Sequence, residues 1–225
     1  MDKSRREARL QRKQADKRQG QLKTLGVVAI GAVIVAVLMI YASQVITPEL
    51  DLDYSSANGS LVGDPDAPVT IVEYVDFQCS FCYNSYISTD PPLFENHITT
   101  GEVLFEYRLV DFLGPESSQA AEAAYCAADQ NLFWQYRDVV WANYPGDLSD
   151  TRLIGFAESV EGLDVESFSA CLDSDEKAAV IEANRAAAQA DGVSGTPSFV
   201  INGTQYAGAQ PYETLQGVIE GIVGN

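Results

Sequence analysis

The chain has 225 residues, four cysteines and one histidine, and its 32 acidic residues outnumber 14 basic ones, giving a net charge of −18. This length fits one domain or one domain with an insertion, and the 46% hydrophobic content is enough to bury a core. A body this acidic repels phosphate backbones, which argues against nucleic-acid binding. The single histidine, His97, excludes histidine-rich metal sites.

The charge is divided unevenly along the chain. Residues 1–24 hold nine basic and three acidic side chains, whereas the chain from Thr47 onward holds five basic and 29 acidic ones. Residues 25–46 carry no charge, and a helix of that length spans about 33 Å, enough to cross a bilayer. The positive-inside rule then places residues 1–24 in the cytoplasm and the remainder outside. We expect an uncleaved transmembrane anchor; a signal peptide cleaved near Ala42 is the alternative.

The folded domain is expected to begin near Asp64. Residues 47–63 are polar and contain Pro, Gly, Ser and Asn, which is typical of a linker. Val69 to Phe77 is apolar at nearly every position and rich in β-branched residues, which predicts a strand covered on both faces.

A βαβ unit follows from the next two segments. A helical pattern begins at the Cys79-Ser80-Phe81-Cys82 segment, and Pro91-Pro92 must kink or restart that helix. His97 falls on the helix near this kink. Glu102 to Val110 is a second strand candidate, about thirty residues after the first, so we expect the two strands to be parallel.

The remaining chain changes from helices back to strands. Residues 114–190 show helical periodicity throughout, with Trp134 and Trp141 as expected core aromatics. A glycine-rich break then leads to a strand, a hairpin, a second strand and a closing helix. The expected segments are Ser117–Asp129, a stripe over 132–140, Ser149–Val160, Val165–Leu172, Asp175–Ala190, Ser198–Asn202, Gln205–Ala207 and Tyr212–Val223. The order β-α-β, helical insertion, β-β-α predicts an α/β fold.

The two cysteines of the Cys79-x-x-Cys82 segment carry the clearest chemical signal. Residues i and i+3 of a first helical turn share a face, so the two sulfur atoms come within disulfide distance. Cys79 sits where the free N–H groups and the helix dipole stabilise a thiolate, and Cys82 lies one turn deeper. A zinc half-site or a structural disulfide is the alternative. Zinc would need a second close pair, but Cys126 and Cys171 are far apart in sequence.

Two acidic residues occupy the first strand. Glu73 shares strand parity with apolar residues, which predicts a buried carboxyl with a raised proton affinity, suited to accept the Cys82 proton. The alternative is a carboxylate at a strand edge that reaches solvent. Asp76 has the opposite parity, and we expect it at the surface.

The residues 73–82 (EYVDFQCSFC) and 192–203 (GVSGTPSFVING) together resemble the DsbA-like thiol-disulfide oxidoreductases. The resemblance covers about residues 60–225 and implies a thioredoxin fold with a helical domain inserted at about 114–190. It also implies that Cys79 is the nucleophile and Cys82 its partner. The Thr196-Pro197 bond would be cis and face both cysteines, and Glu73 matches the buried acid of the family. Ser80-Phe81 departs from the Pro-His pair of the best-known members, and the strength of oxidation depends on that dipeptide.

This resemblance implies an extracytoplasmic oxidoreductase that donates the Cys79–Cys82 disulfide to reduced, unfolded secreted proteins. The implied redox partner is a membrane quinone reductase, with no cofactor and no metal. One alternative is a tethered reductase or isomerase that is fed by a membrane electron carrier. Another is a non-catalytic domain that binds peptides, such as a chaperone, which would keep its function after Cys79→Ser.

Cys126 and Cys171 remain once Cys79 and Cys82 are paired. Each lies in an expected helix of the insertion among apolar or small residues. We expect a structural disulfide between them. Two inert buried thiols and a second redox relay are the alternatives.

Overall fold

The computed structural model describes residues 33–35, 46, 50 and 52–224. The basic segment expected at 1–24 lies outside the described residues, and so does most of the transmembrane helix expected at 25–46. Within the described part of the chain, no helix has both the length and the apolar character needed to cross a bilayer.

Residues 52–224 alternate between strands and helices, and from β2 onward the order of strands and helical regions follows the sequence prediction. The elements are β1 (Leu61–Gly63), β2 (Val69–Val75), α2 (Ser80–Ser88), α3 (Asp90–Leu93), the π-helix η1 (Phe94–Ile98), β3 (Val103–Leu109), α4 (Pro115–Ala128), α5 (Phe133–Ala142), α6 (Asp150–Glu158), α7 (Val165–Asp173), α8 (Ala178–Ala190), β4 (Ser198–Ile201), β5 (Thr204–Ala207) and α9 (Tyr212–Val223).

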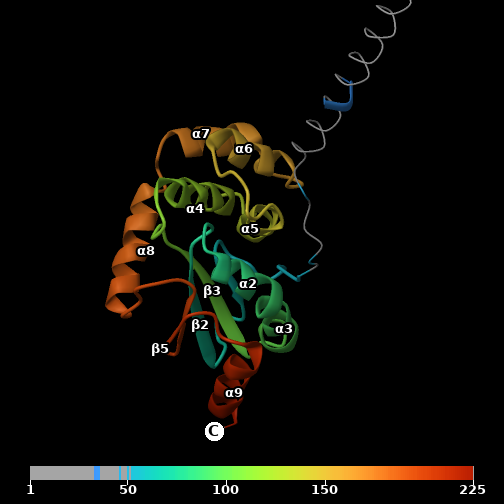
Figure 1. Ribbon diagram of the computed structural model, residues 1–225. Helices are drawn as coiled ribbons and strands as arrows, with labels where there is room; N and C mark the ends of the chain where they lie inside the picture. Colours follow the sequence, from blue (N-terminus) through green and yellow to red (C-terminus); the bar gives the residue numbers. More distant parts are fainter. Residues whose placement is uncertain (1–32, 36–45, 47–49, 51, 225) are drawn as a thin grey trace, which may run out of the picture. The chain divides into compact units, whose positions relative to one another are not determined.

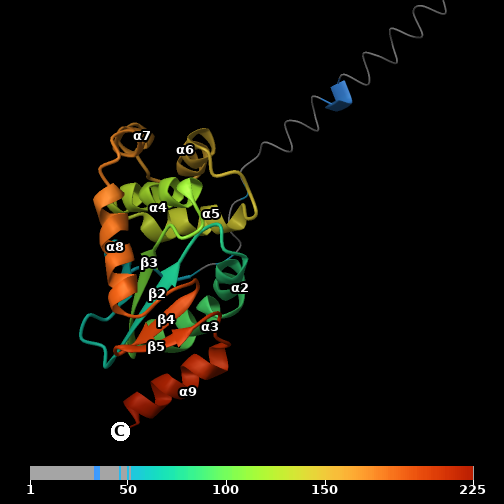
Figure 2. The same ribbon diagram turned by 60° about the vertical axis from the view of Figure 1, so that its left-hand side comes forward.

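The strands form a sheet in the order β1-β3-β2-β4-β5 (Figures 1 and 2). β2 and β3 are parallel, as the βαβ pattern predicts, whereas β4 runs antiparallel to β2 and β5 antiparallel to β4. One face of β2 is fully buried through Val69, Ile71 and Val75, whereas Thr70 and Val72 on the other face are half-buried, so the expected cover on both faces is only partly present. β2 ends at Val75, so the cysteine segment lies beyond the carboxyl end of this central strand.

The helices α4 to α7 gather at one end of the sheet, and α9 lies at the opposite end (Figures 1 and 2). α4 follows Gly114 and begins with Pro115, whose missing N–H costs nothing in a first turn. The Asp164 side chain accepts hydrogen bonds from the backbone of Glu166 and Ser167 and caps α7. The helices between β3 and β4 are the expected insertion. Trp134 and Trp141 of α5 are fully buried as predicted, and they pack against Phe105 of β3 and Phe77 after β2.

The double proline divides the first helical region. α2 ends at Ser88, and α3 begins at Asp90 with proline in its first turn, so the helix restarts there as expected. The π-helix that follows was not anticipated. It carries His97, whose Nδ1 lies 2.7 Å from Glu102 Oε2 and whose Nε2 lies 3.1 Å from the Tyr212 hydroxyl. His97 therefore ties the first helical region to α9.

The segment expected to be a polar linker, residues 47–63, is part of the fold over its described portion. β1 pairs antiparallel with β3, and Val62 in it is fully buried. Gly63 has φ of 110°, and a side chain there would collide with the carbonyl oxygen of Val103. The Tyr54 ring stacks on Trp134 with centroids 5.5 Å apart. The polar composition of this segment did not indicate its packing, because only single apolar side chains such as Tyr54 and Val62 pack against the rest of the domain.

Candidate active site

Cys79 is the N-cap residue of α2 and is 8% exposed. Its φ and ψ of −84° and 117° are extended, so the chain turns from β2 into the helix at this residue. Its side chain makes no capping bond and instead lies beside the loop that precedes β4, where Cys79 Sγ is 3.3 Å from the Thr196 carbonyl oxygen. The expected position at a helix N-terminus is thus confirmed.

The surroundings of Cys79 favour its thiolate. A hydrogen bond from Cys82 lowers the pKa of Cys79 to about 5, against the opposing effect of burial. The Thr196 hydroxyl and the backbone N–H groups of Cys82 and Phe81 act in the same direction as the Cys82 thiol. A lowered pKa favours the ionised form of Cys79 at neutral pH, and the thiolate is the form of cysteine that acts as a nucleophile.

Cys82 has the opposite character. It is 1% exposed, and burial raises the pKa of its thiol well above the ordinary range. The hydrogen bond to Cys79 and the negative charges of Cys79 and Glu73 raise that pKa further. Both cysteines are free thiols in the structure. The pair therefore combines an ionised outer sulfur with a protonated inner one.

The Thr196-Pro197 peptide bond is cis, and Pro197 is buried directly before β4. The backbone of Thr196 faces Cys79 through the 3.3 Å contact, although the two residues are 117 positions apart in sequence. Thr196 and Pro197, predicted as site residues, are thus brought to the cysteine pair. Phe81, inside the pair, is 62% exposed and leaves an aromatic surface next to Cys79.

Glu73 is buried beneath the pair, 1% exposed on β2. Burial raises the pKa of its carboxyl well above the ordinary range, and the negative charge of Asp90 acts in the same direction. Its Oε2 has no hydrogen-bond partner among the described residues. The alternative of a solvent-exposed acid is therefore wrong, because β4 pairs with β2 and covers the edge that it would need.

The expectation of a surface position for Asp76 is also wrong. Asp76 is fully buried and accepts hydrogen bonds from Gln78 N at 2.9 Å, Leu113 N at 3.0 Å and the Ser117 hydroxyl at 2.7 Å. Strand parity does not apply here because β2 ends at Val75. Asp76 instead fastens the cysteine segment to the loop before α4.

A buried ionic cluster next to Glu73 was not predicted. Arg137 on α5 is fully buried; it donates to Asp90 Oδ2 at 3.0 Å and to Asp138 Oδ1 at 2.8 Å. The available signal was that Arg137 follows Phe133 by four residues, on the apolar stripe of a predicted helix. Its partner Asp90 comes from a different element, which periodicity does not reveal.

Cys126 and Cys171 form the expected disulfide, with Cα atoms 5.8 Å apart, joining α4 to α7. Cys171 also lies near Asp129 and Glu176, a grouping of side chains that suits a metal ion by distance alone. A cysteine in a disulfide offers no thiolate ligand, and Lys177 already pairs with both carboxylates. This group is therefore not a metal site.

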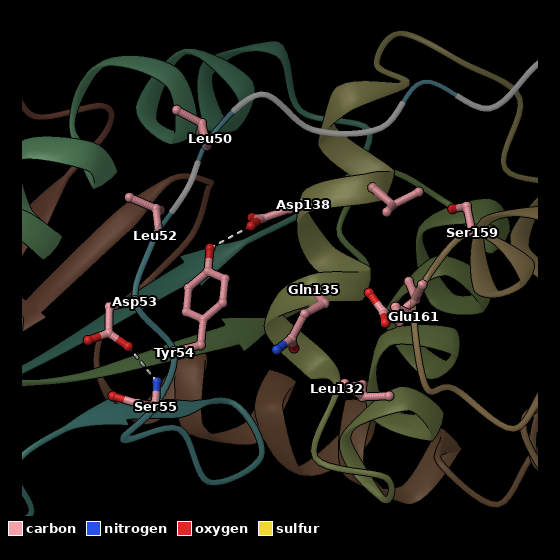
Figure 3. Close-up of a pocket in the computed structure, with 12 residues that line it drawn as sticks. Leu50, Leu52, Asp53, Tyr54, Ser55, Leu132, Gln135, Asp138, Ser159 and Glu161 are labelled. Carbon is pink, nitrogen blue, oxygen red and sulfur yellow. Dashed lines mark hydrogen bonds between the residues drawn. The ribbon is translucent and has the colours of Figure 1, made fainter.

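A pocket of about 920 Å³ lies away from the cysteine pair (Figure 3). Leu50 and residues 52–55 form one wall, and residues of α5 together with 159–161 form the rest. The Tyr54 hydroxyl donates to Asp138 Oδ2 across the pocket at 2.5 Å. The same hydroxyl accepts a hydrogen bond from Arg137 Nη2 at 3.1 Å. The pocket therefore borders the buried ionic cluster.

Comparisons with known proteins agree with this geometry. The family model described as thioredoxin matches residues 55–221, and the chain belongs to this family. The probable disulfide bond formation protein D of Bacillus anthracis is 29% identical over 198 residues, which are 83% of this chain and 90% of that protein. The oxidised BdbD crystal structure from Bacillus subtilis has a TM-score of 0.70 at 22% identity, and the match covers 81% of this chain and all of that one.

A different protein shares the same region. The Na(+)/H(+) antiporter NhaA 1 of Salinispora arenicola is 33% identical over 159 residues, which are 70% of this chain. Those residues are 24% of the antiporter, so the chain spans about a quarter of that relative's length. The family model and the BdbD structure together confirm the expected thioredoxin-like fold with a helical insertion.

Proposed function

We propose that this thioredoxin-family member is a protein-disulfide oxidoreductase that donates the Cys79–Cys82 disulfide to thiols of other proteins. The observation that carries the proposal is the opposite state of the two thiols: the pKa of Cys79 is lowered to about 5, while that of buried Cys82 is raised. A stabilised Cys79 thiolate favours the reduced pair and so makes the disulfide a stronger oxidant.

The reaction proceeds in two exchanges. A client thiolate attacks Cys79 Sγ, a mixed disulfide forms, and the bond to Cys82 breaks; the Cys82 thiolate then takes a proton from Glu73. A second client thiolate attacks the client sulfur of the mixed disulfide, and Cys79 leaves as a thiolate. The client loses two electrons, which the cysteine pair gains. One proton remains on Cys82, and solvent restores the proton of Glu73.

We further propose that the enzyme acts outside the cytoplasm, tethered by a helix over residues 25–46. The division of charge between residues 1–24 and the rest of the chain supports this topology. The Cys126–Cys171 disulfide supports an oxidising compartment, since such bonds are rare in the cytoplasm. Reduced, unfolded secreted proteins would be the clients, and a membrane quinone reductase would re-oxidise the pair.

The equilibrium reduction potential of the full chain against glutathione tests the direction of transfer. A potential above about −180 mV supports donation, whereas one near −270 mV would make the protein a tethered reductase. Cys82→Ser should form a lasting mixed disulfide through Cys79 with a single-cysteine peptide that is supplied as its thiopyridyl disulfide, with thiopyridone as the leaving group, and Cys79→Ser should form none. If Cys79→Ser binds unfolded peptides as the wild type does and its biological function is unchanged, the protein would instead be a peptide-binding domain.

A further inference from the structure

Glu73 lies at the edge of a buried cluster that contains more carboxyl groups than cations. The ionisable groups facing it are Cys79 and Cys82 from α2, Asp90 from α3, Arg137 from α5 and Tyr107 from β3. Tyr107 is its register partner on β3, so the two side chains project from the same face of the sheet. The Tyr107 ring centroid is 4.9 Å from the Arg137 guanidinium carbon.

Arg137 is already engaged by two carboxyl groups. Its guanidinium donates to Asp90 at 3.0 Å and, through Nε and Nη2, to Asp138 at 3.0 and 2.8 Å. The Tyr54 hydroxyl donates to the other oxygen of Asp138 at the pocket wall, which partly offsets the rise that burial causes in the pKa of Asp138 (Figure 3). The positive charge of Arg137 is therefore already shared by the carboxyl groups of Asp90 and Asp138, apart from that of Glu73.

The hydrogen bonds show which carboxyl is left without compensation. Asp90 Oδ1 and Glu73 Oε2 are both buried without a hydrogen-bond partner among the described residues. Asp90 still has its other oxygen on Arg137, but no ion pair to Glu73 is found in that part of the chain. An ionised carboxylate that is buried without a cation is strongly unfavourable, whereas a protonated one is tolerated.

We propose that Asp90 is a positioning residue that keeps Glu73 protonated against the opposing positive charge of Arg137, so that Glu73 can donate its proton to Cys82 when the Cys79–Cys82 bond breaks. Asp90 does so by occupying Arg137 and by placing a second negative charge near Glu73. This inference rests on the proposed disulfide exchange for its kinetic consequence. The protonation of Glu73 itself does not depend on it.

The kinetic consequence concerns one step. When a client thiolate attacks Cys79, the electron pair of the breaking S–S bond moves to Cys82. A proton from Glu73 neutralises that buried sulfur, and Glu73 becomes a carboxylate. An enzyme in which Glu73 is already ionised has no proton to give and places a negative charge beside the leaving sulfur. Loss of Asp90 should therefore slow this step at neutral pH.

The first experiment measures the proton on Glu73 in the full chain. Infrared spectra at neutral pH should contain a carbonyl band of a protonated carboxylic acid that disappears in Glu73→Gln. In Asp90→Asn, the band should titrate away at lower pH than in the wild type. Asp191→Asn, an acid-to-amide change at an exposed partner of Tyr74, is the matched control and should leave the band unchanged.

The second experiment measures reduction of the oxidised enzyme by a two-cysteine peptide across pH. Because client ionisation is common to all variants, the ratio of each rate to the wild type is compared. The rate of Asp90→Asn relative to the wild type should begin to fall at a lower pH, and the loss should stay within the about 10²–10⁴-fold that a proton donor contributes. In a Glu73→Gln background, Asp90→Asn should cause no further change in the rate of reduction. If Asp90 had only a structural role, the substitution would lower the rate in both backgrounds.

Several results would overturn the inference. One is a wild-type spectrum without a protonated-acid band that depends on Glu73. This result can be obtained even if Asp90→Asn does not fold. Another is an unchanged titration in Asp90→Asn, and a third is an equal rate loss in the Glu73→Gln background. If the wild type fails to oxidise the peptide while the band shifts as expected, the proposed function fails and the protonation of Glu73 by this cluster stands.

Discussion

Cys79 Sγ lies 3.3 Å from the backbone carbonyl oxygen of Thr196, across 117 positions of sequence. Cys79 belongs to the βαβ half of the fold and Thr196 to the ββα half, and the helical insertion separates them in the chain. The active site is therefore complete only when β4 pairs with β2. This arrangement couples the chemistry of the cysteine pair to the integrity of the central sheet.

The lowered pKa of Cys79 predicts a pH-dependent stability of the reduced enzyme. The folded thiol has a pKa of about 5 and the reference value is 9.0, so ionisation favours the folded state. This contribution is fully present above the unfolded pKa and is lost as pH falls through about 5. The oxidised enzyme has no thiol there to titrate. The free energy of unfolding of the reduced protein minus that of the oxidised protein should therefore increase from pH 5 to pH 9, as followed by urea denaturation. A constant difference over this window would contradict the prediction.

The Cys126–Cys171 disulfide should stabilise the insertion without taking part in catalysis. It closes a loop of 45 residues, and the chain-entropy relation gives about 4 kcal/mol for that length. We expect the double change Cys126→Ser and Cys171→Ser to lower the free energy of unfolding by about 2–4 kcal/mol. The reduction potential of the Cys79–Cys82 pair should stay unchanged. A shifted potential would instead point to a redox relay between the two pairs.

Asp76 should be needed for the structure of the cysteine segment. Asp76→Ala leaves two backbone donors, Gln78 N and Leu113 N, without their acceptor, whereas the Ser117 hydroxyl keeps Gln78 Oε1 at 2.7 Å. We expect a loss of about 2–4 kcal/mol in the free energy of unfolding, because unsatisfied buried donors are costly. Asp76→Asn keeps an acceptor oxygen and should lose less. Equal losses in the two variants would show that charge, and not hydrogen bonding, is what Asp76 supplies.

Tyr54 should make the segment before β1 a stabilising part of the domain. Its hydroxyl donates to Asp138 and its ring stacks on Trp134. Tyr54→Phe removes the donor, and we expect a loss of about 1–3 kcal/mol in the free energy of unfolding. Tyr54→Ala also removes the stacked ring and should lose more. If both variants unfold like the wild type in urea, this segment is only a tether.

The local sequence was sufficient to predict most elements of the fold. The strands β2 and β3, the break at Pro91-Pro92 and the closing helix α9 all follow from apolar periodicity and proline chemistry. The same information placed Cys79 at a helix N-terminus and Cys82 deeper, because three residues of spacing within a first turn fix both. The predicted burial of Glu73 also followed from strand alternation alone.

The errors have a common physical origin. Asp76 was expected at the surface because alternation was extended past the last residue of β2, whereas hydrogen bonds from the loop before α4 decide its burial. Residues 52–63 were taken as linker because only a few of them, such as Tyr54 and Val62, carry the packing.

The sequence by itself determined the α/β order, the helical insertion and the position of Cys79 at a helix N-terminus, since each depends on residues close together in the chain. Tertiary structure alone decided what surrounds the buried acid. Asp90, Arg137 and Glu73 come from α3, α5 and β2 and meet only when these elements pack. The proton affinity of a buried group depends on distances between such elements, and no local pattern contains those distances.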